Sequence, residues 1–365
     1  MKTVCKFDIC SGCNACVNIC GKKAIKIDDG MKNFNAVIDE TLCVKCGKCK
    51  KVCPIVSTPE VRKPFLWFQG WSKNNEVRSM SSSGGVATEI IRNFIREGGY
   101  VCSCAFIDGE FTFFTTNELP KVSLYSGSKY VKSNPQSEYK KINSLLQDGQ
   151  HVLFVGLPCQ VAGMINYCKN NENLFTVDLI CHGTPSKKLL SSYLEQHDVD
   201  LSSIKSIAFR NKTNYGIQVD GKSLSINGEI DRYLIAYLEG QICTDGCYEC
   251  KFAKMERCSD ITLGDNWASE YIEELSQGVS LILCQTEKGK KLLDKLDIIL
   301  MNVDLEKAAS VNSQLREPAS KRDHRESLMY DLLCKKKYDQ VFLKYYPRQC
   351  IRQLIKSVAI RLHLK

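Results

Sequence analysis

Cysteines at regular spacing are the residues whose type and position point most directly to chemistry. The chain holds 21 cysteines among 365 residues, and nine fall within the first 53. Two runs share the spacing C-x2-C-x2-C-x3-C, and their members are Cys10, Cys13, Cys16 and Cys20, then Cys43, Cys46, Cys49 and Cys53. Soft thiolates favour zinc or iron–sulfur clusters over hard cations. This spacing is typical of bacterial ferredoxins, in which the fourth cysteine of a run serves the other cluster.

The two runs therefore predict two [4Fe–4S] clusters with exchanged fourth ligands. One cluster is expected on Cys10, Cys13, Cys16 and Cys53, and the other on Cys43, Cys46, Cys49 and Cys20. Pro54 follows the second run as the pattern requires, whereas Gly21 stands where the first run would have proline. The alternative is a pair of four-cysteine zinc sites, which the complete double run disfavours. Cys5 lies outside the pattern and is not expected to be a ligand.

A second group of cysteines lies in the middle of the chain. Cys247 and Cys250 form a two-ligand clip, and two of Cys159, Cys181, Cys243 and Cys258 would complete a third cluster. Taken alone, Cys243, Cys247, Cys250 and Cys258 could form a zinc knuckle. Cys159 and Cys181 each follow an expected strand, and open α/β sheets bind ligands at their strand ends. The alternatives are a reactive thiol at a helix N-terminus for Cys159 and ordinary burial for Cys181.

Two segments rich in small and polar residues are candidates for binding phosphate. Residues 81–85 read Ser-Ser-Ser-Gly-Gly and precede an expected helix, whose N-terminus would offer N–H groups and positive potential. Residues 127–130 read Gly-Ser-Lys-Tyr and add a cation, hydroxyls and an aromatic ring. A helix cap and a surface turn are the simpler explanations. Neither segment matches the dinucleotide fingerprint G-x-G-x-x-G.

The elements that must position these groups alternate between strands and helices after residue 65. Strands are expected at 65–71, 100–107, 111–116, 151–157, 174–181 and 279–285, and helices at 86–97, 159–169, 185–197 and 287–297. The stretches 24–27 and 36–38 predict a hairpin between the two cysteine runs. The fold class is thus α/β in the mixed α+β sense: a small dicluster ferredoxin domain at 1–58, then a larger mixed α/β domain at 65–330.

Charge separates the end of the chain from the rest. Of the net charge of +9, residues 335–365 hold nine lysines and arginines and one acid, so the remainder is nearly neutral and nucleic-acid binding is not expected. Residues 331–365 are expected to form a basic amphipathic tail, which would either contact an anionic membrane surface or a partner, or pack on the body. Without a long apolar run or an apolar signal segment, a cytoplasmic location is expected, with peripheral contact at the inner membrane face through the tail.

Taken together, six motifs resemble the coenzyme F420 hydrogenase/dehydrogenase beta-subunit family behind an N-terminal dicluster ferredoxin domain. They occur in the expected order over about residues 65–290, as Ser82-Ser-Gly-Gly85, Gly127-Ser-Lys-Tyr-Val131, Gly156-Leu-Pro-Cys-Gln160, Ile180-Cys-His-Gly-Thr-Pro-Ser186, Cys247-Tyr-Glu-Cys250 and Asp260-Ile-Thr-Leu-Gly-Asp-Asn-Trp267.

The resemblance implies FAD and a nearby third [4Fe–4S] cluster, so the larger domain would be flavin-binding. By resemblance, the FAD contacts would be Ser82, Ser83, Gly84, Gly85 and Lys129, with Asp265 close to the flavin or the cluster. The leading ligands of the third cluster would be Cys159, Cys181, Cys247 and Cys250. A site made of Cys243, Cys247, Cys250 and Cys258 is the alternative. His182 is a candidate for moving a proton, although such a residue is more often a hydrogen-bonding neighbour.

These expectations describe an iron–sulfur flavoprotein oxidoreductase. Electrons would pass between three [4Fe–4S] clusters and FAD, to or from coenzyme F420, ferredoxin or a small organic substrate. One alternative is an electron carrier without catalysis, in which the larger domain only docks to a partner enzyme. Another is a zinc-stapled binding protein that uses its basic tail.

Overall fold

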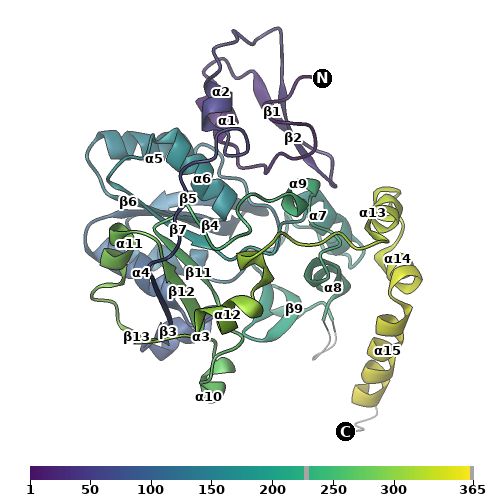
Figure 1. Cartoon of the computed structure of the whole chain (residues 1–365). Coiled ribbons are helices and arrows are strands. Elements are labelled where there is room, and N and C mark those ends of the chain that lie inside the picture. The colour runs from purple at the N-terminus through teal and green to yellow at the C-terminus, as the bar shows by residue number, and fades with distance from the viewer. Residues whose placement is uncertain (226–229, 362–365) are drawn as a thin grey trace.

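The computed structural model describes residues 1–225 and 230–361, and its N-terminal unit reflects the repeat in the sequence (Figure 1). Each cysteine run contains a short helix, and a hairpin joins the two copies. The elements are α1 (Ala15–Ile19), β1 (Ile25–Asp29), β2 (Phe34–Ile38) and α2 (Lys48–Val52). The strands β1 and β2 pair in antiparallel fashion, with Ile25 opposite Ile38. The expected hairpin is therefore confirmed.

An eight-stranded mixed sheet forms the centre of the larger domain, in the order β13-β3-β12-β11-β7-β6-β4-β5. The strands are β3 (Leu66–Ser72), β4 (Tyr100–Ile107), β5 (Glu110–Thr116), β6 (Val152–Gly156), β7 (Leu174–Leu179), β11 (Ile261–Asp265), β12 (Ser280–Cys284) and β13 (Ile298–Met301). The strands β11, β7, β6 and β4 run parallel to their neighbours in that set, and the outer pairs are antiparallel. The expected mixed α/β class is confirmed.

Apolar side chains cover both faces of this sheet, as the alternation along β6 illustrates. Val152 and Phe154 pack with α5 (Glu138–Gln147), α6 (Pro158–Tyr167) and the N-terminal unit. Leu153 and Val155 pack on the other face, against α4 (Val86–Arg96), η1 (Leu119–Tyr125) and α11 (Glu287–Leu293). Since successive strand residues point to opposite faces, one apolar strand holds both layers. The N-terminal unit thus shares a core with the larger domain.

The remaining elements lie around the sheet and toward the C-terminus. They are α3 (Asn75–Met80), α7 (Lys187–Glu195), β8 (Ile207–Asn211), β9 (Asn214–Val219), β10 (Lys222–Ser223), α8 (Arg232–Leu238), α9 (Asp245–Tyr248), α10 (Ile272–Leu275), α12 (Leu305–Ser310), η2 (Ser313–Leu315), α13 (Arg325–Leu333), α14 (Tyr338–Tyr345) and α15 (Pro347–Arg361). The strands β8, β9 and β10 form a separate small sheet. The expected strands and helices are all present, the helices after β6, β7 and β12 being shorter than expected.

The C-terminal segment, expected as a basic tail from residue 331, packs on the body in its first part. That boundary falls inside α13, and Tyr338, Val341 and Phe342 are buried against α7 and α8. The helices α13, α14 and α15 lie to one side of the eight-stranded sheet (Figure 1), and α15 exposes Ile351 and Ile355. The last four residues of the expected tail, 362–365, lie outside the described residues. Among the described helices, none has the combined length and hydropathy needed to cross a bilayer.

Candidate functional site

The cysteines of the N-terminal unit gather in two sets that differ in exposure. The expected first set, Cys10, Cys13, Cys16 and Cys53, is buried against the larger domain. Burial is the main cause that raises the pKa of the Cys16 thiol, and the nearby thiols of Cys13, Cys10 and Cys53 raise it further. These four side chains therefore lie close enough to interact electrostatically. In the other set Cys46 is exposed, and Cys20, Cys43 and Cys49 are half-buried. The first set thus faces inward and the second faces solvent.

Helix α6 joins the inward set to the sheet. The Tyr139 hydroxyl lies 2.9 Å from the Cys13 carbonyl oxygen and 3.3 Å from the Gln160 carbonyl oxygen. A Cβ atom added to Gly163 would lie only 3.3 Å from the Cys13 sulfur, so the helix packs directly on this thiol. Cys159 at the start of α6 is itself a neighbour that raises the pKa of Cys13. The first turn of α6 therefore bridges the N-terminal unit and the middle of the chain.

Four thiols from the middle of the chain converge beyond Cys13. Burial raises the pKa of the Cys181 thiol, and the neighbouring thiols of Cys247, Cys159 and Cys250 raise it further. Burial, then Cys159 and Cys247, raises the pKa of Cys250 to about 12. The sulfurs accept backbone hydrogen bonds, from Gly183 to Cys181 and from Thr184 to Cys247, both at 3.4 Å. Such N–H···S bonds are among the groups by which a protein adjusts a cluster.

The two remaining candidates of this region occupy different positions. The Cys243 sulfur lies 3.7 Å from the His182 carbonyl oxygen, and Cys243 neighbours Cys247 and Cys181. Burial raises the pKa of Cys258 to about 12, and its charged neighbours are Asp178, Arg257 and Asp260. The alternative set with Cys243 and Cys258 is therefore less compact than the set with Cys159 and Cys181, because Cys258 has charged residues and not the other thiols as its neighbours. Among the described residues, no group of three or more His, Cys, Asp or Glu side chains is arranged to hold a metal ion.

A cavity of about 490 Å³ opens beside Cys181, one of the four thiols. Cys181, His182 and Gly183 line one part of its wall, and Arg210 and Trp267 line another. The expected cofactor contacts Ser82, Ser83, Gly85, Lys129 and Asp265 also line it. Gly84 is buried behind this wall, where its N–H donates to the Ser280 hydroxyl oxygen at 3.1 Å. The structure thus brings three segments to one cavity: residues 81–85, called the serine loop below, the turn at 127–130, and Cys181 after β7.

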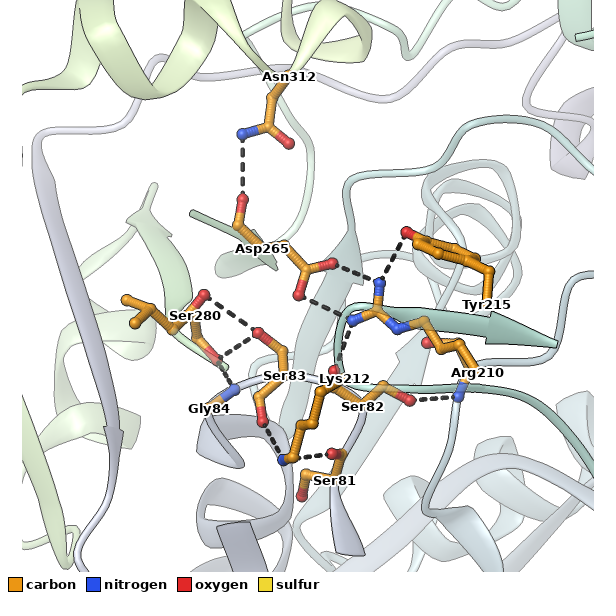
Figure 2. Close-up of polar contacts among 12 residues, drawn as sticks. Ser81, Ser82, Ser83, Gly84, Arg210, Lys212, Tyr215, Asp265, Ser280 and Asn312 are labelled. Carbon is orange, nitrogen blue, oxygen red and sulfur yellow. Dashed lines mark hydrogen bonds and ion pairs between the residues drawn. The ribbon is translucent and has the colours of Figure 1, made fainter. Parts of the chain in front are cut away.

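Two cations hold the carbonyl groups of the serine loop (Figure 2). The Lys212 ammonium donates to the carbonyls of Ser81 and Ser83, at 2.7 and 3.1 Å. The Arg210 guanidinium donates to the Ser82 carbonyl at 2.6 Å. With these carbonyls engaged, the loop leads into α4, whose start has no side-chain cap. The uncapped N–H groups of a helix start favour an anion such as a phosphate.

Arg210 also fixes the position of Asp265. It grips the Asp265 carboxylate with two parallel hydrogen bonds of 2.9 and 3.0 Å, and its side chain is almost fully buried. The guanidinium lies 5.5 Å from the Trp267 ring centroid and 5.6 Å from that of Tyr215. Stacking and bidentate pairing together hold Arg210 in a single orientation. Asp265 is therefore a partner of Arg210 in the cavity wall.

Lys129 and His182 have their polar atoms engaged within the protein. The Lys129 ammonium donates to the carbonyls of Tyr125 and Ser126, both at 2.8 Å, and burial lowers the pKa of Lys129. His182 places Nε2 3.0 Å from the Leu238 carbonyl, and Nδ1 3.0 Å from the Gln314 amide. A carbonyl oxygen can only accept, so Nε2 carries the proton. Burial lowers the pKa of His182, which favours this neutral, fixed ring and gives no support to proton transfer by it.

Sequence reasoning missed Arg210 and Lys212. Both come from the small β8–β9 sheet, which was not expected, and Lys212 sits in its turn with a φ of 55°. Their partners, Ser81–Ser83 and Asp265, are more than fifty residues away along the chain. An alternating pattern around a two-residue turn at 212–213 was the available signal.

Comparison with known proteins matches two separate segments of the chain. Residues 149–303 match the family model for the C terminus of the coenzyme F420 hydrogenase/dehydrogenase beta subunit, and residues 9–56 match the model for a 4Fe-4S dicluster domain. Coenzyme F420-dependent sulfite reductase from Methanocaldococcus jannaschii is 22% identical over 320 residues, which cover 80% of this chain and 46% of that relative. The chain thus spans about half the length of this relative.

Two further similarities agree. A protein named only as uncharacterized protein MJ1349 from Methanocaldococcus jannaschii is 22% identical over 324 residues, covering 77% of this chain and 84% of its own length. A chain of the F420-reducing [NiFe] hydrogenase complex from Methanosarcina barkeri has a similar fold, with a TM-score of 0.50, 18% identity and coverage of 74% and 94%. The resemblance expected from the motifs is confirmed by these matches: the chain carries a segment that matches a 4Fe-4S dicluster domain, followed by a segment that matches the C terminus of the coenzyme F420 hydrogenase/dehydrogenase beta subunit.

Proposed function

We propose that the chain is an FAD-dependent iron–sulfur oxidoreductase in which a third [4Fe–4S] cluster links the dicluster domain to a flavin. The observation that carries this proposal is the convergence of Cys159, Cys181, Cys247 and Cys250 between the inward cysteine set and the cavity. A line of redox sites from solvent to the cavity follows. Electrons would travel along it to or from coenzyme F420, ferredoxin or an organic substrate.

The thiols fit a cluster by their chemistry. Burial keeps Cys181 and Cys250 neutral in the absence of metal, because it raises the pKa of both thiols. As ligands of iron these cysteines would be thiolates, since a coordinating thiol is deprotonated. The N–H groups of Gly183 and Thr184 then stabilise the thiolates of Cys181 and Cys247. The two sets of the dicluster domain supply the first two clusters in the same proposal, with ligands exchanged between the runs.

The cavity fits FAD through the serine loop. In this proposal the pyrophosphate lies at the uncapped start of α4, near Ser82, Ser83 and Gly85. Lys212 and Arg210 orient the loop by binding its carbonyls, and Gly84 holds it to Ser280 from behind. Lys129 adds a positive charge to the cavity wall. When bound, FAD supplies the exchange between hydride chemistry and single-electron transfer.

In this proposal residues 1–58 form the dicluster unit, and residues 65–330 form the unit that binds the flavin and the third cluster. The segment from 331 onward is a basic C-terminal extension whose first part packs on the body. In α15 the exposed Ile351, Ile355 and Val358 support peripheral contact with an anionic surface through this helix. Co-sedimentation with vesicles that contain anionic lipid, with and without residues 347–365, tests that contact.

Anaerobic quantification of iron, acid-labile sulfide and flavin tests the proposed function. We expect about twelve iron and twelve sulfide per chain, together with FAD, because three cubane clusters would be present. A screen of coenzyme F420, ferredoxin and organic acceptors then identifies the partners. Clusters without flavin would instead indicate an electron carrier that lacks catalysis, and zinc in place of iron would remove the electron-transfer interpretation.

The outward cysteine set is the expected entry point for electrons from a partner protein. Lys45, Lys48, Lys50 and Lys51 are exposed around it, and residues 41–51 contain no acid. We therefore expect reversal of two charges, Lys48→Glu with Lys51→Glu, to slow reduction by an acidic ferredoxin about tenfold at low salt. Stopped-flow spectroscopy measures this rate, and the difference should shrink at high salt.

The matched control for that experiment is Lys290→Glu with Lys291→Glu on α11, where the lysines are equally exposed. Photoreduction with a neutral reductant should be the same for all three proteins. Equal rates with the acidic ferredoxin for wild type and both double variants would contradict an entry point at the outward set.

FAD binding should also weaken as pH rises. Burial, with repulsion from Arg78 and Arg210, lowers the pKa of Lys212 to about 8. An anionic pyrophosphate nearby would raise that pKa, so FAD binding above pH 8 takes up a proton. Affinity must then fall with rising pH, by at most about tenfold per pH unit. Flavin fluorescence titrations across this range measure the effect. Lys212→Arg should flatten the profile, and an unchanged slope in that variant would contradict the assignment to Lys212.

A further inference from the structure

A buried lysine lies between the inward cysteine set and the four thiols of the middle region. Lys132 is only 9% exposed, and its ammonium lies 3.7 Å from the Cys159 sulfur. Its backbone N–H donates to the Pro185 carbonyl at 2.9 Å, which fixes the residue at the end of the Gly127–Val131 segment. A Cβ atom added to Gly12 would approach the Lys132 Cε to 3.2 Å, so the lysine stem packs on the first cysteine loop.

The neighbours of the Lys132 ammonium are thiols from both sides of this boundary. They are Cys159, at 3.7 Å, with Cys247, Cys13 and Cys181 around it. Of these, Cys13 belongs to the dicluster domain and the other three to the proposed third site. Within residues 1–225 and 230–361, no carboxylate forms an ion pair with this ammonium.

A buried ammonium is costly unless negative charge compensates it. Carboxylates do not do so here, so the compensation has to come from thiolates and from whatever they bind. A four-thiolate iron–sulfur cluster carries net negative charge, which becomes more negative by one on reduction. A fixed positive charge at hydrogen-bond distance from one ligand therefore favours the reduced state, and net charge is one determinant of cluster potential.

We propose that the Lys132 ammonium is the shared counter-charge of the inward cluster and the third cluster, and that it raises the reduction potential of both. This inference rests on the proposed function, because it needs clusters at both sites. The step concerned is the passage of one electron from one site to the other, with no bond made or broken and no proton moved. A positive charge placed between the sites stabilises the electron on either side and raises both potentials together.

The test compares Lys132→Gln with wild type in redox titrations of the whole protein, followed by electron paramagnetic resonance under anaerobic conditions. We expect the midpoint potentials of two clusters to shift to more negative values and that of the outward cluster to shift less. Lys140→Gln on α5 is the matched control, since Lys140 is exposed and its change should leave all potentials in place. Flavin content reports that the cavity remains intact, because Lys132 is not part of its lining.

Lys132→Arg separates charge from packing. If glutamine removes a cluster while arginine keeps it, the charge is required and the proposal stands. If both variants lose the same cluster, packing is the cause and the proposal fails. It also fails if Lys132→Gln holds all three clusters at wild-type potentials. Wild-type protein without a third cluster would instead overturn the proposed function itself, so the two failures are distinguishable.

Discussion

Replacing Cys250 with serine is expected to remove one iron–sulfur cluster and to leave the two clusters of the dicluster domain in place. Iron and sulfide should each fall by about a third, because one of three four-iron clusters is lost. The physical reason is that a hydroxyl oxygen is a harder and less readily ionised ligand than a thiolate. Electron paramagnetic resonance of the reduced protein, with iron counted on the same sample, measures the result.

Cys258→Ser is the matched control for this change. Cys258 lies eight residues further along the chain and is also shielded from solvent, but its neighbours are Asp178, Arg257 and Asp260. We expect this variant to keep all three clusters. Equal cluster loss in the two variants would favour the alternative set with Cys243 and Cys258. Loss of every cluster signal in Cys250→Ser would contradict the assignment of three separate sites.

The parts of the site that could be predicted from the sequence are those encoded by local spacing. The two cysteine runs specify a repeated loop and helix, and the structure forms both helices and the hairpin between them. Likewise Gly156-Leu-Pro-Cys159 marks the end of a buried strand and the start of a helix, which places Cys159 at that junction. In each case the geometry needs only a few neighbouring residues, so the pattern alone is sufficient.

The charged residues of the site could not be predicted, because their roles depend on partners distant in sequence. Lys132 follows the Gly127–Val131 motif, but no residue near it in the sequence indicates that Cys13 and Cys159 would lie beside its ammonium. Arg210 lies in the short β8–β9 hairpin, whose alternation indicates strands but not that Arg210 would reach Ser82 and Asp265. The packing of Tyr338 and Phe342 on α7 and α8 could not be predicted for the same reason. The short apolar face of this segment lies among many basic residues, and its packing partners are distant in sequence.

The second large effect is expected for Arg210→Met. This change leaves the Asp265 carboxylate without its bidentate partner, and it frees the Ser82 carbonyl. Asp265 and Ser82 both line the cavity. Breaking one side of a buried ion pair costs about 3–5 kcal/mol, and the partial exposure of Asp265 places this case near the lower limit. We expect a comparable fall in the free energy of unfolding and a loss of FAD affinity of roughly a hundredfold.

The double variant Arg210→Met with Asp265→Leu separates these two effects. Replacing both members of a buried pair with apolar residues is often nearly neutral for stability, so denaturant unfolding of the double variant should return close to wild type. FAD affinity, measured by flavin fluorescence, should stay low, because the Ser82 carbonyl is still released and the serine loop has lost its anchor. Recovery of flavin binding together with stability would mean that Arg210 serves only to neutralise Asp265. A double variant that is stable and free of flavin would instead show that the Arg210–Asp265 pair is needed to shape the cavity for the cofactor.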